Sequence, residues 1–137
     1  MIRIICGAKG KGKTKEMLSL AEQAVQKAEG SVVYVDKSEQ HMHELNNKIR
    51  LINITEYNVD TCEGFLGFLS GLLAGNYDIE TVFVDSFLKL AKATPENVEK
   101  VIDALDAINS DVDFIVSISA DKGDLPSSVY DKIEYSC

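Results

Sequence analysis

The sequence is poor in cysteine, and it has no long apolar run. Its three cysteines, at positions 6, 62 and 137 of 137 residues, form no CxxC pair. An odd number of scattered thiols, behind an N-terminus without the pattern of a secretion signal, argues against a disulfide-stabilised exported protein. The longest apolar stretch, 64–75, is interrupted by glycine and is shorter than the roughly 20 residues that span a bilayer. We therefore expect a cytoplasmic protein without a membrane span.

Basic residues are also scarce. Fourteen Lys and Arg residues stand against 22 Asp and Glu residues, which gives a formal net charge of −8. This charge opposes nonspecific binding to a phosphate backbone, so no intrinsic nucleic-acid surface is expected. An anion would have to be bound by a local group of positive charges. Lysines at positions 9, 11, 13 and 15 form such a group.

The hydrophobic pattern predicts one domain, residues 1–137, because 45% of the residues are hydrophobic and there are two prolines and no linker. Short β-branched runs predict strands at 2–6, 32–35, 49–54, 81–85, 114–118 and 129–135. Three- and four-residue spacing predicts helices at 14–29, at about 60–76, and from Pro95 onward with Thr94 as the cap, plus a short helix at 38–46.

Strands that alternate with helices favour parallel pairing through right-handed crossovers. The expected fold is therefore α/β, a three-layer α/β/α sandwich with a mostly parallel central sheet and 49–54 at its edge. Ligands of such sheets bind at the carboxyl ends of the strands. This rule places the loop that begins at Gly7 along the same rim of the sheet as Asp36, Asp85 and Ser119.

Residues 7–14, GAKGKGKT, match the phosphate-loop pattern G-x-x-x-x-G-K-[ST] in full. The glycines allow successive N–H groups to point at a polyphosphate, and the helix that follows adds unpaired amides. We expect Lys13 to reach the β and γ phosphates and the Thr14 hydroxyl to bind Mg²⁺. The predicted nucleotide-binding residues are Gly7, Lys9, Gly10, Lys11, Gly12, Lys13, Thr14 and Ser119. Ser119 is a candidate sensor of the γ phosphate, although a serine that caps a loop would give the same pattern.

A second candidate metal ligand ends the apolar run 82–84. Asp85 follows this expected strand at the same rim as the loop. Mg²⁺ keeps most of its waters when it binds to proteins, and one carboxylate that accepts hydrogen bonds from those waters suits it. Thr14 and Asp85 are thus the predicted metal residues.

Three segments together resemble the P-loop NTPases and, within them, the RecA-like ATPases. They are the loop at 7–14, the VFVDS segment at 82–86 and the VYVDKSE segment at 33–39. The resemblance extends over about residues 2–120, and the loop is its most specific part. It implies a minimal single-domain member with the P-loop NTPase fold. It also implies that the ligand is ATP or another nucleoside triphosphate with Mg²⁺.

The sequence departs from this group where water would be activated. Many members have a Glu directly after the metal-strand Asp, and this chain has Ser86 there. RecA-like members often place the catalytic Glu just after the second strand, and Glu39 lies about one residue later than that. Asp36 and Glu39 are both candidates for orienting the attacking water, and both could instead cap the segment 38–46.

The chain has two arginines, and neither Arg3 in the first strand nor Arg50 on the expected edge strand is placed to act within the same molecule. Lys122 is a weaker candidate cation. We therefore expect an ATPase with slow intrinsic hydrolysis that acts through a partner protein or self-association. A nucleotide-binding switch that turns over slowly or not at all is the alternative. A kinase is a third hypothesis, although the short chain leaves little for an acceptor site and a lid.

Overall fold

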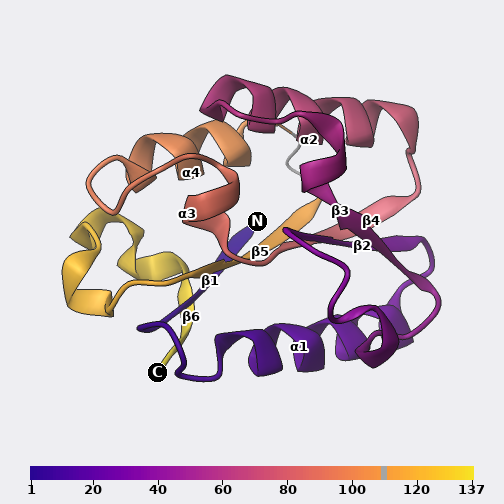
Figure 1. Ribbon diagram of the computed structural model, residues 1–137, viewed down its shortest axis with the longest axis horizontal. Helices are drawn as coiled ribbons and strands as arrows, with labels where there is room; N and C mark the ends of the chain where they lie inside the picture. The colour runs from indigo at the N-terminus through magenta and orange to yellow at the C-terminus, as the bar shows by residue number, and fades with distance from the viewer. Residues whose placement is uncertain (109–110) are drawn as a thin grey trace.

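The computed structural model describes residues 1–108 and 111–137, and it has a central sheet between two layers of helices (Figure 1). The described strands are β1 (Ile2–Cys6), β2 (Ser31–Asp36), β3 (Ile49–Asn53), β4 (Ile79–Val84), β5 (Asp113–Ile118) and β6 (Ile133–Ser136). They form one sheet in the order β3-β2-β4-β5-β1-β6, and they pair in parallel. The expected α/β/α sandwich is confirmed, and β3 lies at an edge as predicted.

The helices cover the two faces of the sheet unequally. Helix α1 (Lys13–Lys27) lies on one face, and α2 (Cys62–Gly75), α3 (Phe87–Leu90) and α4 (Val98–Asp106) lie on the other (Figure 1). Met17 and Ala21 of α1 pack with Tyr34 and Phe83 in one apolar cluster. A larger cluster forms on the opposite face beneath the other helices. Two clusters form because successive side chains of a strand point to opposite faces of the sheet.

The helix expected at 38–46 was a wrong prediction. The segment contains a single 3₁₀ turn, η1 (Met42–Glu44). Ser38 and Asn46 explain the difference, because their side-chain oxygens accept hydrogen bonds from the nearby amides of Gln40 (3.3 Å) and Lys48 (2.9 Å). Such local bonds compete with the hydrogen bonds of a helix.

Two other expected elements begin later in the chain than predicted. Helix α4 begins at Val98, not at Pro95, and its N-cap residue is Asn97 rather than Thr94. The Asn97 side chain accepts a hydrogen bond from the Thr94 amide at 2.8 Å, which closes a turn ahead of the helix. Near the C-terminus, the 3₁₀ segment η4 (Ser127–Lys132) occupies the start of the expected last strand, and β6 starts only at Ile133.

The remaining 3₁₀ segments are η2 (Ile54–Tyr57) and η3 (Lys122–Asp124). In residues 1–108 and 111–137, we find no helix whose length and apolar character would allow it to cross a membrane.

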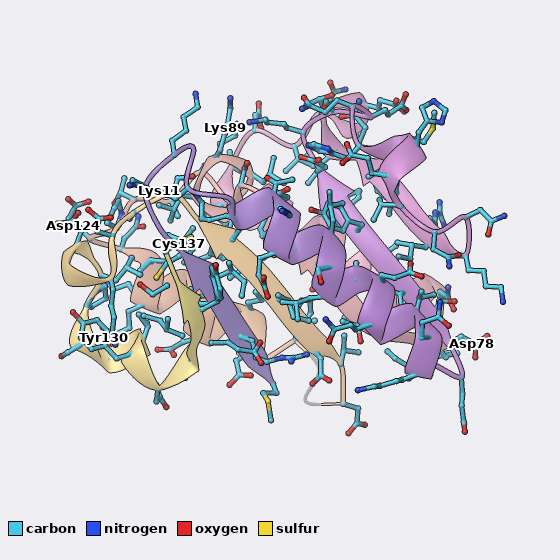
Figure 2. The ribbon with its side chains drawn as sticks, turned by 90° about the horizontal axis from the view of Figure 1, so that it is seen from below. Lys11, Asp78, Lys89, Asp124, Tyr130 and Cys137 are labelled. Atoms are coloured by element: carbon cyan, nitrogen blue, oxygen red, sulfur yellow. The ribbon has the colours of Figure 1, made fainter. Side chains whose placement is uncertain are left out.

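The carboxyl ends of the central strands meet the loop that follows β1. The Gly7 amide donates hydrogen bonds to the carbonyls of Ile118 (3.3 Å) and Ala120 (2.9 Å), just after β5. The Cys137 amide donates to the Cys6 carbonyl at 3.0 Å, so β6 also ends beside the loop (Figure 2). The loop is thereby attached to both neighbours of β1, and this rim of the sheet positions the candidate site.

Candidate nucleotide site

The loop between β1 and α1 adopts the backbone conformation that its glycines were expected to permit. Gly10 and Gly12 have φ values of 85° and 90°, in the left-handed region that favours glycine. Gly12 is also the N-cap residue of α1 and has no side chain that could cap the helix. The first amides of α1 therefore remain available to an anion at the end of the loop, where the helix dipole favours negative charge.

Lys13 is the first residue of α1, and its side chain lies against the loop. The residue is 7% exposed, and its Nζ donates a hydrogen bond to the Ala8 carbonyl at 3.0 Å. A buried ammonium group is costly unless hydrogen bonds or negative charges compensate for the lost water. A phosphate oxygen would supply that negative charge.

Asp85 directly follows β4, is 4% exposed and accepts three side-chain hydrogen bonds. Its Oδ2 accepts from the Thr14 hydroxyl at 3.1 Å and from the Tyr34 hydroxyl at 2.9 Å. Its Oδ1 accepts from the Ser117 hydroxyl at 2.7 Å, and that hydroxyl in turn accepts from the Ser86 amide at 2.7 Å. The structure therefore brings together Thr14 and Asp85, the two predicted metal residues, although 71 positions separate them in the sequence.

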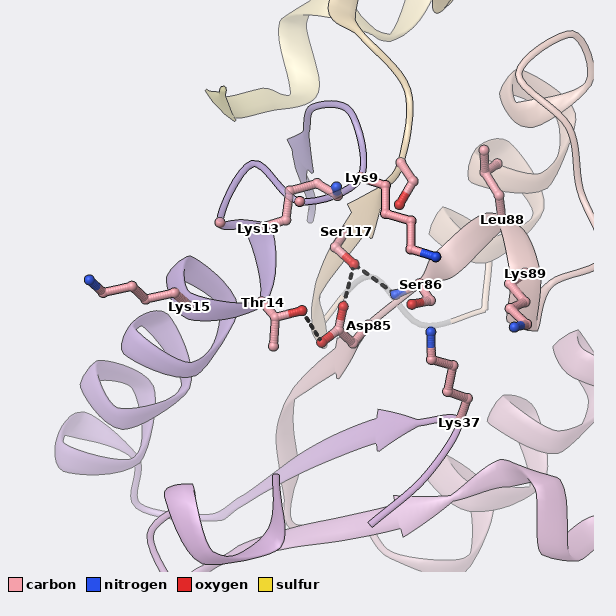
Figure 3. Close-up of a pocket in the computed structure, with 13 residues that line it drawn as sticks. Lys9, Lys13, Thr14, Lys15, Lys37, Asp85, Ser86, Leu88, Lys89 and Ser117 are labelled. Atoms are coloured by element: carbon pink, nitrogen blue, oxygen red, sulfur yellow. Dashed lines mark hydrogen bonds between the residues drawn. The ribbon is translucent and has the colours of Figure 1, made fainter. Parts of the chain in front are cut away.

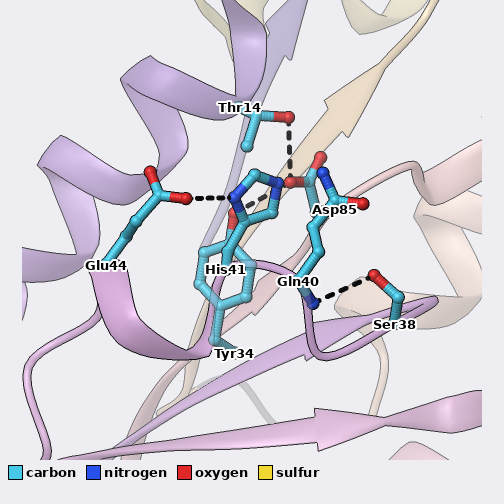
Figure 4. Close-up of polar contacts among 7 residues, drawn as sticks. All are labelled: Thr14, Tyr34, Ser38, Gln40, His41, Glu44 and Asp85. Carbon is cyan, nitrogen blue, oxygen red and sulfur yellow. Dashed lines mark hydrogen bonds and ion pairs between the residues drawn. The ribbon is translucent and has the colours of Figure 1, made fainter.

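The Tyr34 hydroxyl is a donor that the sequence did not reveal. Burial raises the pKa of Tyr34 above its ordinary value, and the nearby negative charge of Asp85 raises it further. The hydroxyl therefore stays protonated and donates a hydrogen bond to the carboxylate (Figure 4). The ring stacks on Phe83 with centroids 5.9 Å apart and planes inclined by 16°, so the donor is fixed in place.

A cavity of about 510 Å³ opens between the loop and the ends of β4 and β5 (Figure 3). The lysines among its lining residues are Lys9, Lys13, Lys15, Lys37 and Lys89. Its hydroxyl-bearing lining residues are Thr14, Ser86, Ser117 and Ser119, and Asp85 contributes a carboxylate. In a chain with a net charge of −8, this lining is a local concentration of positive charge. A site of this kind attracts anionic ligands.

Six of the eight residues predicted to bind the nucleotide line this cavity, and the other two, Gly7 and Lys11, are not among its lining residues. Lys9, Gly10, Gly12, Lys13, Thr14 and Ser119 belong to the lining. Lys11 is exposed on the outer side of the loop (Figure 2). Gly7 is packed against the C-terminal strand, and a Cβ atom at that position would lie 2.8 Å from the Cys137 sulfur. The Cys137 carbonyl oxygen would lie 3.1 Å from the same Cβ atom, and the φ of 153° at position 7 also favours glycine.

Asp36 and Glu39, the two candidates for orienting the attacking water, are also not among the residues that line the cavity. Glu39 is exposed. Asp36 is 3% exposed, and its Oδ1 accepts a hydrogen bond from the Lys37 amide at 2.7 Å. Burial raises the pKa of Asp36, and the hydrogen bond from Lys37 opposes that shift only in part. Asp36 thus stabilises the turn after β2 through a backbone contact, and its role in orienting water remains a prediction.

A second cavity, of about 590 Å³, shares Thr14 and Lys15 with the first and is also lined by His41 and Glu44. His41 Nδ1 lies 2.8 Å from a Glu44 carboxylate oxygen (Figure 4). In the described part of the chain, no group of three or more His, Cys, Asp or Glu residues is arranged to hold a metal ion. We therefore interpret the contact between His41 and Glu44 as a local interaction beside the main cavity.

The sequence reasoning missed several residues of the site, among them Tyr34, Lys37, Lys89 and Ser117. Tyr34 and Lys37 belong to the segment 33–39 that was singled out, but the pattern did not show which side chains face Asp85. Ser117 lies inside the apolar run 114–118, where a polar residue is a signal that could have been used. Lys89 comes from the short helix α3 and had no sequence signal.

Comparisons with known proteins support the fold. No protein-family model matches the chain, and no curated protein matches its sequence. Among solved structures, the chain is similar to the flagellar accessory protein FlaH from Methanocaldococcus jannaschii, with a TM-score of 0.61 and 22% sequence identity. The match covers 93% of this chain and 64% of the FlaH chain. The chain therefore shares the α/β fold of this structural neighbour, and it spans 64% of the neighbour's length.

Proposed function

We propose that the chain binds a nucleoside triphosphate together with Mg²⁺ in the lysine-lined cavity and hydrolyses it slowly. One observation carries this proposal. The Thr14 hydroxyl and the Asp85 carboxylate, hydrogen-bonded at 3.1 Å, lie beside a glycine-rich loop at the N-terminus of α1. The loop provides amides and lysines for phosphate, and the oxygen pair provides a place for a divalent cation.

The residues present fit Mg²⁺. This ion is hard, prefers oxygen ligands and keeps several of its waters. The Thr14 hydroxyl would bind it directly, and Asp85 would accept hydrogen bonds from its waters. When bound, the ion would neutralise part of the charge on the phosphate oxygens. The hydrogen bonds from Tyr34 and Ser117 hold the Asp85 carboxylate in one orientation for this purpose.

The same residues fit the triphosphate. Lys13 already points along the loop toward the Ala8 carbonyl, and a phosphate oxygen would be a stronger acceptor for its ammonium group. The amides after Gly12 would bind a phosphate at the start of α1. These residues would bind and orient the polyphosphate, and that positioning is most of what this class of reaction asks of the protein.

Slow hydrolysis is proposed because neither candidate for orienting water lines the cavity as described. Asp36 is buried and contacts the Lys37 amide, and Glu39 is exposed. Intrinsic rates of related unassisted sites are on the order of 10⁻⁴ to 10⁻³ s⁻¹. The same observation favours the second candidate function, a nucleotide-binding switch that does not turn over by itself.

A partner protein or a second copy of the chain would then be needed for faster turnover. Arg3 NH1 lies 3.4 Å from the Glu134 carboxylate, and Lys122 lies over the Tyr130 ring at 5.0 Å. Arg50 is exposed on β3, at the edge of the sheet. Among the three cations considered from the sequence, Arg50 is therefore the one placed to reach a neighbouring molecule.

Equilibrium titration tests the binding proposal directly. Wild-type protein is titrated with ATP, GTP and ADP, each with and without Mg²⁺, and the Lys13→Ala variant is measured beside it. We expect Mg-ATP binding that Lys13→Ala reduces at least tenfold while the far-UV circular dichroism is unchanged. Lys27→Ala, which removes the same charge at the other end of α1, is the control and should bind like wild type. Unchanged ATP affinity in Lys13→Ala would contradict the proposed site.

Phosphate release measured across a hundredfold range of protein concentration separates the two functions. An ATPase that acts through self-association gives a turnover per molecule that rises with concentration, and Arg50→Ala removes this rise without changing nucleotide affinity. A switch binds Mg-ATP and releases no phosphate at any concentration. Rapid turnover that does not depend on concentration would contradict both.

A further inference from the structure

Lys37 is the first residue after β2, and its backbone is fixed next to Asp85. Strands β2 and β4 are neighbours in the sheet, and the Asp85 amide donates a hydrogen bond to the Val35 carbonyl at 3.0 Å. The Lys37 amide is held in turn by the buried Asp36 carboxylate at 2.7 Å. Lys37 therefore enters the cavity from a constrained turn, on the wall opposite the phosphate loop.

The Lys37 side chain points into the cavity. Figure 3 shows Lys9 from the loop and Lys37 from the end of β2 directed toward the same region beside Ser86. Lys15 also contributes to the lining, but its side chain points away from Asp85 (Figure 3). Among the described residues, Lys37 forms no ion pair within 4.0 Å. The charge of Lys37 acts on the buried Asp36 carboxylate from a longer distance. The cavity thus has, opposite its loop, an ammonium group without a close ion pair.

We propose that Lys37 binds the terminal phosphate of the triphosphate and makes the site selective for triphosphate over diphosphate. The inference rests on the proposed function, because it assumes that a nucleotide occupies the cavity. The loop wall holds Lys13 and the amides of α1, and these groups suffice for a diphosphate. The additional phosphate brings its charge toward the opposite wall, where Lys37 lies.

The size of the effect follows from exposure. Lys37 is exposed, so water screens part of its attraction for a phosphate oxygen, and partial desolvation by the bound nucleotide strengthens that attraction. We therefore expect loss of the Lys37 charge to weaken triphosphate binding about tenfold, which corresponds to about 1.4 kcal/mol.

The experiment compares ATP with ADP by calorimetric titration in Mg²⁺ at a fixed, physiological salt concentration. Lys37→Ala should bind ATP about tenfold more weakly than wild type and ADP within a factor of two of wild type. Lys37→Arg keeps the positive charge and should retain most of the preference for ATP. Lys27→Ala removes the same charge from an exposed position at the far end of α1, outside the cavity lining, and it should bind both nucleotides like wild type.

Three results would overturn the proposal. Equal losses of ATP and ADP affinity in Lys37→Ala would place its contribution elsewhere on the nucleotide. An equal loss of ATP affinity in Lys27→Ala would reduce the effect of Lys37 to the general charge of the protein. A Lys37→Ala variant that keeps wild-type affinity for ATP would exclude the contact. If wild type itself binds neither nucleotide, the proposed function fails and this inference fails with it, whereas each of the three other results leaves nucleotide binding intact.

Discussion

Replacing Tyr34 by Phe would test whether the buried hydroxyl stabilises the Asp85 carboxylate. The change removes the hydroxyl that donates to Asp85 Oδ2 at 2.9 Å and keeps the aromatic ring that stacks on Phe83. No large cavity is created, because the ring itself stays. The expected effect is therefore that of one hydrogen bond to a charged acceptor, about 1.5 to 3 kcal/mol of unfolding free energy.

This magnitude converts to a measurable shift in Tm. With an unfolding entropy of about 2.1 cal/mol/K per residue, a chain of this length loses roughly 3.5 °C in Tm per kcal/mol. Tyr34→Phe should thus lower the Tm by about 5 to 10 °C, as followed by circular dichroism. Tyr77→Phe is the matched control, because the Tyr77 side chain is 96% exposed and loses the same hydroxyl to solvent. Its Tm should stay within about 1 °C of wild type.

A double-mutant cycle then assigns the effect to the pair. In an Asp85→Asn background the acceptor is neutral, so removing the Tyr34 hydroxyl should cost only about 0.5 to 1.5 kcal/mol. If Tyr34→Phe has the same cost in both backgrounds, the hydroxyl does not act through the Asp85 charge. A wild-type Tm in Tyr34→Phe alone would refute the reasoning entirely.

Three further predictions concern the same rim and one helix. Asp36→Asn should stabilise the fold at neutral pH, because burial raises the pKa of the Asp36 carboxyl in the folded state. The contribution of this carboxyl to the stability of the fold therefore decreases as the pH rises from its pKa in the unfolded chain through its higher pKa in the folded chain. Urea unfolding from pH 4 to 8 should show the variant's advantage growing with pH, and an advantage that shrinks with pH would contradict the sign. Asp85→Asn should weaken nucleotide binding more in Mg²⁺ than in EDTA, since its contact would run through metal-bound water; equal losses would exclude that role. Gly12→Ala should lower the free energy of unfolding by about 1 to 2 kcal/mol, because Gly12 has a φ of 90°. Gly71→Ala in α2, where a Cβ atom meets open space, should raise the free energy of unfolding by up to about 1 kcal/mol. Comparable urea midpoints for the two variants would contradict this.

The fold and the turn conformation of the glycine-rich loop at 7–14 could be predicted because their signals are local. Short β-branched runs, the spacing of apolar residues in α1 and the glycines of 7–14 each act within a few residues. The weakest predictions fell where short polar side chains compete with the helix backbone, as Ser38 does after β2 and Asn97 does before α4. There, the sequence allows both a helix and a turn, and side-chain hydrogen bonds decided for the turn.

The sequence by itself determined the class of fold, the rim at which the strands end, and the placement of Thr14 and Asp85 at that same rim. Only the tertiary structure decided that Tyr34 and Ser117 donate to Asp85 and that Lys37 faces the loop. The physical reason is the order of the strands. Parallel neighbours are joined by long crossovers, so β2, β4 and β5 come together through packing of the whole sheet. The side chains that meet at their ends therefore carry no local signal of one another.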